Sequence, residues 1–200
     1  MIELLGTKMI FERTIKMKYI YNDEHVVSYS DMDCNLKFSA ISALTIVQDM
    51  MTSYYKHIGS DNLTIREKNN ALWVLTRTKL KFYKELSWKD KISGTTYTTK
   101  VKPIRMEMET NFVDENDEMV FLASQELCPI DMSTRRTKKI NDVEFPNDME
   151  CIEAEYEGES LNLHVNFDES NKVYEHKVMF ADLDLSGHTN NVSYVKYLFN

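Results

Sequence analysis

One change in hydrophobic period constrains the fold of this chain more than any other feature. From Ser39 to Ile58 apolar residues recur every three or four positions, and Gly59 follows them. This spacing predicts an amphipathic helix of about five turns with its end at the glycine. The segments on either side alternate every two residues, as β-strands do. The sequence therefore predicts one long helix among strands.

The strands are expected to form an antiparallel sheet. Residues 11–30 read as extended with a break at Tyr21-Asn22-Asp23, and four strands are expected at 72–82, 92–101, 105–113 and 119–130. In the first of these four, strict alternation predicts two faces. One face would carry Val74, Thr76, Thr78, Leu80 and Phe82, and the other Arg77, Lys79 and Lys81. A sheet wrapped around one helix is the hot-dog arrangement, an α+β fold.

A polar motif occurs twice at a fixed offset. Residues 30–37 align with residues 181–188, and both copies read Asp-x-Asp before an amphipathic segment. The second copy has Ser186 where the first has Asn35, and His188 where the first has Lys37. Such self-similarity predicts two copies of one structural unit. Because a lysine cannot replace an imidazole base near neutral pH, we expect Asp31, Asp33 and Asn35 to be structural.

Charge is distributed unevenly along the chain. The net charge is −8, but residues 141–171 contain ten acids and no Lys or Arg, so the remainder is slightly basic. This acidic segment includes Pro146 and Gly158 and has little periodicity, which predicts a linker. No basic patch is interleaved with stacking aromatics, so a nucleic-acid partner is not expected.

The remaining composition favours a cytoplasmic globular protein. Three widely spaced cysteines fit neither a disulfide framework nor a zinc site. No apolar run approaches the roughly 20 residues of a membrane span, and the N-terminus lacks the apolar core of a signal peptide. We expect no metal and no cofactor.

Four ordered stretches give the chain a specific resemblance. They are Tyr29-Ser30-Asp31-Met32-Asp33, Trp73-Val74-Leu75-Thr76-Arg77, Pro129-Ile130-Asp131-Met132-Ser133-Thr134-Arg135-Arg136 and Asp182-Leu183-Asp184-Leu185-Ser186-Gly187-His188-Thr189-Asn190-Asn191-Val192-Ser193-Tyr194. In this order they resemble the acyl-acyl carrier protein (acyl-ACP) thioesterase family. The resemblance implies two tandem hot-dog domains that hydrolyse fatty acyl-ACP, an acyl-phosphopantetheine thioester, to free fatty acid in fatty acid biosynthesis.

The resemblance also implies catalytic residues. The family motif is similar to D-x-N-x-H-x-N-N, which corresponds here to Asp184, Ser186 and His188, with serine in place of the usual asparagine. His188 would activate water, and Asp184 would orient or charge the site. We add Asn191 and backbone N–H groups at the following helix start as expected oxyanion donors. The alternative reading is that the histidine is a structural hydrogen-bonding residue and the aspartates are helix caps.

Two further sets of residues are candidates for substrate contacts. For the acyl chain they are Val47, Met50, Met51, Tyr54 and Trp73, and for docking of the carrier protein they are Arg135, Arg136, Lys138 and Lys139. Thioether side chains adapt to flexible apolar ligands. The alternative for the first set is ordinary core packing, and the alternative for the second is a solvated strand end.

The expected organisation is a first hot-dog domain at 1–140, an acidic linker at 141–172 and the start of a second hot-dog domain at 173–200. The family's further catalytic Cys or Glu would lie beyond the motif, so it has no counterpart here. Two other functions stay open: a non-catalytic acyl-thioester-binding module, and another hot-dog enzyme such as an acyl-CoA thioesterase or dehydratase. Assembly as a homodimer is also left open.

Overall fold

The structure is a computed structural model that describes residues 18–156, 158, 168 and 172–199. The chain divides into two compact units, Met1–Tyr156 and Glu157–Asn200. Each unit is described by itself below. Within the described part of the chain, no helix combines the length and the apolar character that crossing a membrane requires.

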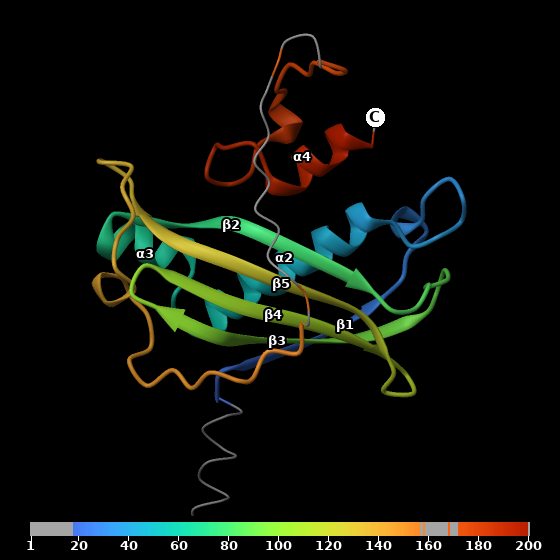
Figure 1. The fold of residues 1–200 in the computed structure, drawn as a ribbon, viewed down its shortest axis with the longest axis horizontal. Helices are drawn as coiled ribbons and strands as arrows, with labels where there is room; N and C mark the ends of the chain where they lie inside the picture. The colour runs from blue at the N-terminus through green and yellow to red at the C-terminus, as the bar shows by residue number, and fades with distance from the viewer. Residues whose placement is uncertain (1–17, 157, 159–167, 169–171, 200) are drawn as a thin grey trace, which may run out of the picture. The chain divides into compact units, whose positions relative to one another are not determined.

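The first unit is built on one antiparallel sheet of five strands in the order β1-β3-β4-β5-β2 (Figure 1). The strands are β1 (Ile20–Val26), β2 (Ala71–Phe82), β3 (Lys91–Lys102), β4 (Arg105–Asp114) and β5 (Met119–Asp131). The four strands predicted after the long helix are therefore confirmed, with ends within one residue of those expected. Because β2 pairs with β5 and not with β3, the first and the last of the four lie side by side.

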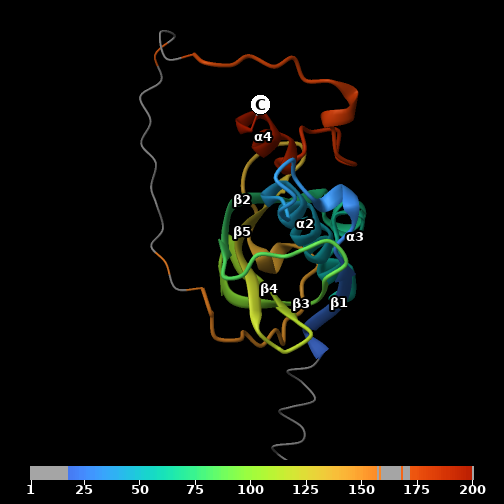
Figure 2. The ribbon, with the colours of Figure 1, turned by 90° about the vertical axis from the view of Figure 1, so that its right-hand side faces the viewer.

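The long helix α2 (Ala40–His57) is also confirmed, and it lies against one face of the sheet (Figure 2). The Ser39 hydroxyl caps it by accepting a hydrogen bond from the Ser42 N–H at 3.0 Å. Its buried residues follow the expected three- and four-residue spacing: Ala43, Val47, Met50, Met51, Tyr54 and Tyr55. The sheet thus buries one stripe of a single helix, as the change of period predicts.

A second helix, α3 (Asn62–Asn69), was not predicted. Its local signals are clear in the structure, since the Asp61 carboxylate accepts hydrogen bonds from the N–H groups of Leu63 and Thr64, both at 3.1 Å. Asn70 ends the helix in the left-handed conformation, with φ 51°. Only Ile65 is buried along its length, so the helix has no apolar stripe to reveal it in the sequence.

The core between α2 and the sheet consists of two hydrophobic clusters. The first holds Met51, Tyr54, Tyr55, Ile65, Ala71, Trp73, Met106, Met108, Leu127, Ile140 and Val143. The second holds Val27, Ala43, Val47, Met50, Leu86, Ile92, Phe112, Val120, Phe121 and Ala123. Helix α2 contributes to both clusters, so it spans the whole core.

Two local predictions are wrong. The expected break at Tyr21-Asn22-Asp23 is part of β1, because this segment pairs residue by residue with β3. Strict alternation along β2 also fails, since the register shifts between Leu75 and Arg77. Before this bulge Trp73 and Leu75 pack into the core, and beyond it Leu80 does, whereas Thr76 is exposed and hydrogen-bonds Glu126. A bulge adds one residue to one strand and reverses the facing of the residues that follow it.

The acidic segment begins as part of the first unit and not as a free linker. A 3-10 turn at Ile140–Asp142 places Ile140 and Val143 in the first cluster. Further along, the N–H groups of Glu155 and Tyr156 donate to the carboxylate of Glu109, which is only 1% exposed. Residues 141–156 therefore pack on the sheet that precedes them. The remainder of the expected linker falls largely outside the described residues.

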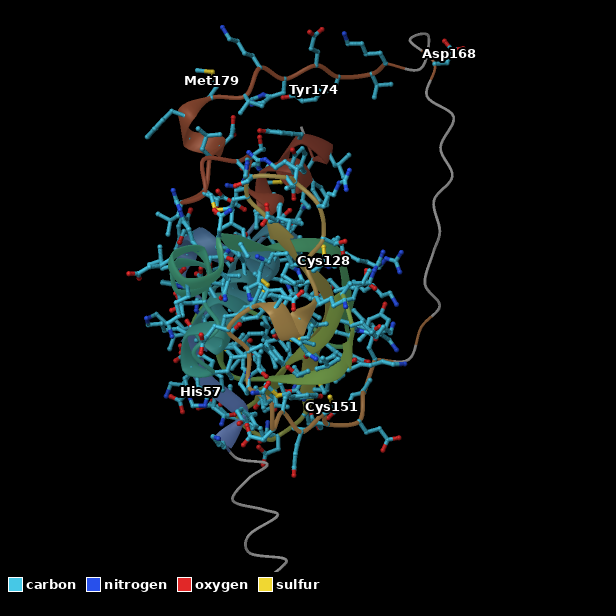
Figure 3. All side chains as sticks on the ribbon, turned by 90° about the vertical axis from the view of Figure 1, so that its left-hand side faces the viewer. His57, Cys128, Cys151, Asp168, Tyr174 and Met179 are labelled. Atoms are coloured by element: carbon cyan, nitrogen blue, oxygen red, sulfur yellow. The ribbon has the colours of Figure 1, made fainter. Side chains whose placement is uncertain are left out.

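The cysteines are all free. Cys128 is buried in β5, whereas Cys34 and Cys151 are exposed. Figure 3 labels Cys128 and Cys151 at separate places in the first unit. In the second unit, the described residues include a 3-10 turn at Phe180–Asp182 and the helix α4 (Asn191–Leu198).

Candidate active site

The loop between the 3-10 turn and α4 carries the motif that the sequence singled out. A bridge between Leu183 and Thr189 closes this loop. The carboxylate of Asp184 accepts hydrogen bonds from the N–H groups of Ser186 at 2.8 Å and His188 at 3.2 Å. The Asp184 backbone N–H in turn donates to the His188 carbonyl at 2.8 Å. Asp184 is therefore the hub that folds the loop.

The side chains of the motif differ in their exposure and in their hydrogen bonds. His188 is exposed, and its imidazole makes no hydrogen bond to any residue that the structure describes. Ser186 is half-buried, and Asn191 is the exposed first residue of α4. Asn190 is the cap, accepting from the Val192 N–H at 2.8 Å. The structure thus brings the motif residues onto one loop, but the Asp184 carboxylate contacts backbone and not the His188 ring.

A histidine outside the motif fixes the start of the loop. His176 Nε2 lies 2.9 Å from Asp182 Oδ2, and the same oxygen accepts from the Met179 N–H at 2.7 Å. The His176 ring lies 4.2 Å from the ring of Tyr197 on α4, centroid to centroid. These contacts, led by His176, hold the pKa of Asp182 below its usual value. His176 was not among the predicted site residues.

The first copy of the motif has the same architecture 151 positions earlier. His25 Nε2 lies 2.9 Å from Asp31 Oδ2, as His176 does from Asp182. Asp33 accepts from the N–H groups at positions 35 and 37, as Asp184 does from those at 186 and 188. Helices α2 and α4 begin at equivalent positions, 40 and 191. The predicted repeat is confirmed. Extending the sequence alignment of the two copies to His25 and His176 would have revealed His176.

The two copies differ at the residue after the turn. Gly187 has φ 72°, and Leu36 occupies the equivalent left-handed conformation with φ 59°. Leucine is strained there, whereas glycine is not. The side chain that follows is His188 in the second copy and Lys37 in the first, where it pairs with Glu85 at 2.5 Å. The first copy keeps the scaffold of the loop and lacks the imidazole.

The predicted acyl-chain residues are all buried between α2 and the sheet, but in different clusters. Val47 and Met50 belong to the second cluster, whereas Met51, Tyr54 and Trp73 belong to the first. The polar atoms of the two aromatics are already used: Tyr54 Oη lies 2.7 Å from Thr98 Oγ1, and Trp73 Nε1 donates to the Ser60 carbonyl at 2.8 Å. Burial raises the pKa of Tyr54 to about 12, so its hydroxyl stays neutral.

The predicted docking residues follow the end of β5. Arg135, Arg136 and Lys139 are exposed. Lys138 is half-buried and donates to the Asn69 carbonyl at 2.7 Å, with Asp131 3.6 Å away. Three of the four cations are therefore presented to solvent, and the fourth ties the strand end to α3. Among the described residues, no three His, Cys, Asp or Glu side chains converge as a metal site would require.

Comparison with solved structures identifies the fold. An acyl-ACP thioesterase from Bacteroides thetaiotaomicron has a TM-score of 0.78 at 18% identity, over 90% of this chain and 72% of its own. The 12:0-ACP thioesterase from Umbellularia californica has a TM-score of 0.72 at 16% identity, over 91% and 74%. A 1,4-dihydroxy-2-naphthoyl-CoA thioesterase from Synechocystis has a TM-score of 0.55 at 13% identity, over 60% and 89%. These likenesses confirm the hot-dog fold of the thioesterases.

The family follows from the sequence. The profile described as the acyl-ACP thioesterase N-terminal domain matches residues 18–145, more than half of the chain. The chain therefore belongs to the acyl-ACP thioesterase family, which makes it a thioester hydrolase. The match covers the helix and sheet of the first unit and ends before the Asp184–His188 loop. No curated protein was found to match the sequence.

Proposed function

We propose that this protein uses the Asp184–His188 loop to hydrolyse fatty acyl-ACP, releasing free fatty acid and carrier protein. The reaction would serve fatty acid biosynthesis in the cytoplasm. The observation that carries the proposal is the pair of hydrogen bonds from the Asp184 carboxylate to the backbone of Ser186 and His188. They hold an exposed imidazole directly before the start of α4, where the positive end of the helix dipole can polarise a carbonyl.

In the proposed reaction His188 takes a proton from water as the hydroxide attacks the thioester carbon. Donors at the start of α4, together with the Asn191 side chain, stabilise the oxyanion that forms. The carbon–sulfur bond then breaks, and the proton passes from the imidazolium to the leaving sulfur. Asp184 acts by shaping the loop. Ser186, in place of the family's asparagine, offers a shorter hydrogen-bonding group.

The other elements of the proposal concern substrate binding. The acyl chain enters the first unit between α2 and the sheet, against Val47, Met50 and Met51, whose burial suits an apolar ligand. The acidic carrier protein docks near the exposed Arg135, Arg136 and Lys139. The work is thus divided between a first unit that binds the chain and a second that carries the chemistry.

The test is release of free fatty acid by the full-length protein carrying His188→Ala. Loss of a general base typically lowers the rate by about 10² to 10⁴. The matched control is His57→Ala, which removes an exposed imidazole from α2 and should leave turnover unchanged. Acyl-CoA of the same chain length, run in parallel, identifies the carrier. Hydrolysis by His188→Ala at the wild-type rate would overturn the catalytic assignment and favour the acyl-binding module.

A further inference from the structure

A row of polar side chains crosses the interior of the first unit between the two hydrophobic clusters. Thr96, Thr98, Thr110 and Gln125 come from three neighbouring strands, and none is more than 2% exposed. The strand register aligns Thr98 with Met108, Met108 with Gln125, and Gln125 with Thr78 on β2. We call these five polar residues, Thr78, Thr96, Thr98, Thr110 and Gln125, the polar seam.

The polar seam faces α2. On β5 the residues that alternate with Gln125 on the same face are Phe121, Ala123 and Leu127. All three belong to the clusters that pack against α2. On the helix, Met50 belongs to one cluster and Met51 to the other, so the seam lies beneath the middle of α2. An acyl chain that follows the proposed pocket from Val47 to Trp73 has to cross it.

Three threonines of the polar seam have hydrogen-bond partners within the protein, but the side-chain oxygen of the glutamine does not. Thr96 Oγ1 lies 2.9 Å from Thr110 Oγ1, and Thr98 Oγ1 lies 2.7 Å from the hydroxyl of Tyr54. Gln125 Oε1 is fully buried, and in the described part of the chain it accepts no hydrogen bond. Buried carbonyl oxygens in native proteins are nearly always paired, because leaving one unpaired is costly.

We propose that Gln125 is a specificity-determining residue that binds a hydroxyl group on the acyl chain of the substrate. The inference rests on the proposed function and names a substrate class for it: hydroxylated acyl thioesters. A hydroxyl donates to the unpaired Oε1, whereas a plain methylene chain offers no donor and leaves the oxygen unpaired. The apolar clusters on either side of the seam accommodate the methylenes before and after the hydroxyl-bearing carbon.

Discrimination of this kind is strong when a site contains a buried polar group. A site built to hydrogen-bond a substrate hydroxyl penalises an analogue without it, because the protein group is then left unpaired. One neutral hydrogen bond corresponds to a factor of about ten in binding or rate. The hydroxylated chain is therefore expected to be preferred by about tenfold.

The experiment compares acyl-ACP substrates of one chain length, plain or hydroxylated at successive carbons, with the full-length protein. Wild type should show a kcat/KM about ten times higher for the best-placed hydroxyl than for the plain chain. Gln125→Met, which keeps the side-chain length and removes the amide, should abolish this ratio and still hydrolyse the plain chain. The control is Ser124→Ala, since residue 124 points to the opposite face of β5. Thermal melting checks that both variants are folded.

Binding of the free fatty acids, measured by calorimetry, separates this proposal from the proposed function. If wild type hydrolyses neither substrate but binds the hydroxylated acid more tightly, the proposed function fails and the role of Gln125 stands. Equal treatment of plain and hydroxylated chains in both assays would overturn the role of Gln125, leaving a buried water as its partner. An unchanged preference in Gln125→Met would overturn it as well.

Discussion

At the scale of the residue, Asp184 shows why a motif aspartate need not act through its charge. Its carboxylate accepts hydrogen bonds from two backbone N–H groups of the loop, and Asp33 makes the same contacts in the copy that has lysine in place of His188. A carboxylate that recurs where there is no base is part of the scaffold. Asp184 would then act on His188 by fixing the conformation of the loop that carries it.

This role predicts a difference between two substitutions. Asp184→Asn keeps an oxygen that can accept both N–H groups, so it should retain turnover within about threefold of wild type. Asp184→Ala removes the acceptor, releases the loop and should lower kcat by about tenfold or more. Steady-state hydrolysis of acyl-ACP measures both. If Asp184→Asn is as impaired as Asp184→Ala, the charge of Asp184 is required and its role is electrostatic.

The aspartate of the first His–Asp pair predicts how stability responds to acid. Burial by itself raises the pKa of Asp31, but hydrogen bonds from Ser28 and His25 outweigh it and lower the pKa below the usual value. The ionised form is thus favoured in the folded state. Its stabilisation is present above the ordinary pKa of about 4 and is lost as the pH falls through the folded value.

Thermal melting between pH 6 and pH 2 tests this expectation. The Tm of wild type should fall as the pH drops below about 4. Asp31→Asn, which has no carboxyl to protonate, should be less stable at pH 6 and should lose less Tm on acidification. A decline as steep in Asp31→Asn as in wild type would show that other groups govern the acid response.

At the scale of the element, the 3-10 turns before α2 and α4 are anchors of the same design. In each, a histidine contacts the aspartate that also accepts the N–H of the residue just before the turn. Only the second turn leads into a loop with an imidazole. We therefore expect the pair His176–Asp182 to position His188, and the pair His25–Asp31 to stabilise the first unit.

Matched substitutions in the two anchors should separate these roles. His176→Ala should lower kcat by roughly tenfold with little change in KM, because loss of orientation acts on the chemical step. His25→Ala should lower the Tm of the protein and leave kcat unchanged. His176→Gln, which keeps a donor, should recover part of the rate. Equal kcat values for wild type and His176→Ala would exclude a positioning role.

The elements themselves were predictable to different extents. Helix α2 and the four strands after it have strong periods, so their bounds could be read from the sequence almost to the residue. The bulge in β2 could not, because an extra residue is specified by pairing with β5 and leaves no local signal in the alternation. Helix α3 was missed since it buries only Ile65. In the motif, spacing revealed the loop, but His176 lies outside it and is recognised only when the repeat is extended.

At the scale of the whole molecule, the chain repeats one helix start and one anchored loop but places the imidazole in the second copy alone. The first copy is completed by a sheet and a buried core, whose polar seam and pliable methionines suit substrate binding. In the proposed function, divergence at one residue, lysine or histidine after the turn, separates binding from chemistry. Whether the first unit folds by itself then depends on where its boundary lies.

The position of this boundary gives the last prediction. Sequence composition placed the end of the first domain at residue 140, whereas the compact unit extends to Tyr156. A fragment of residues 1–156 should unfold in one cooperative transition. A fragment of residues 1–140 loses the burial of Val143 and both N–H donors to the buried Glu109 carboxylate.

Removing these contacts should cost the shorter fragment about 3 kcal/mol or more, since the Glu109 carboxylate loses two hydrogen-bond donors and an apolar cluster is opened. For a domain of this size that corresponds to a Tm lower by roughly 6–12 °C. The substitution Glu109→Gln in the longer fragment tests the carboxylate by itself, because it removes the charge while the donors from Glu155 and Tyr156 stay in place. If the two fragments melt at the same temperature, residues 141–156 contribute nothing to the first unit, and the composition had located the boundary correctly.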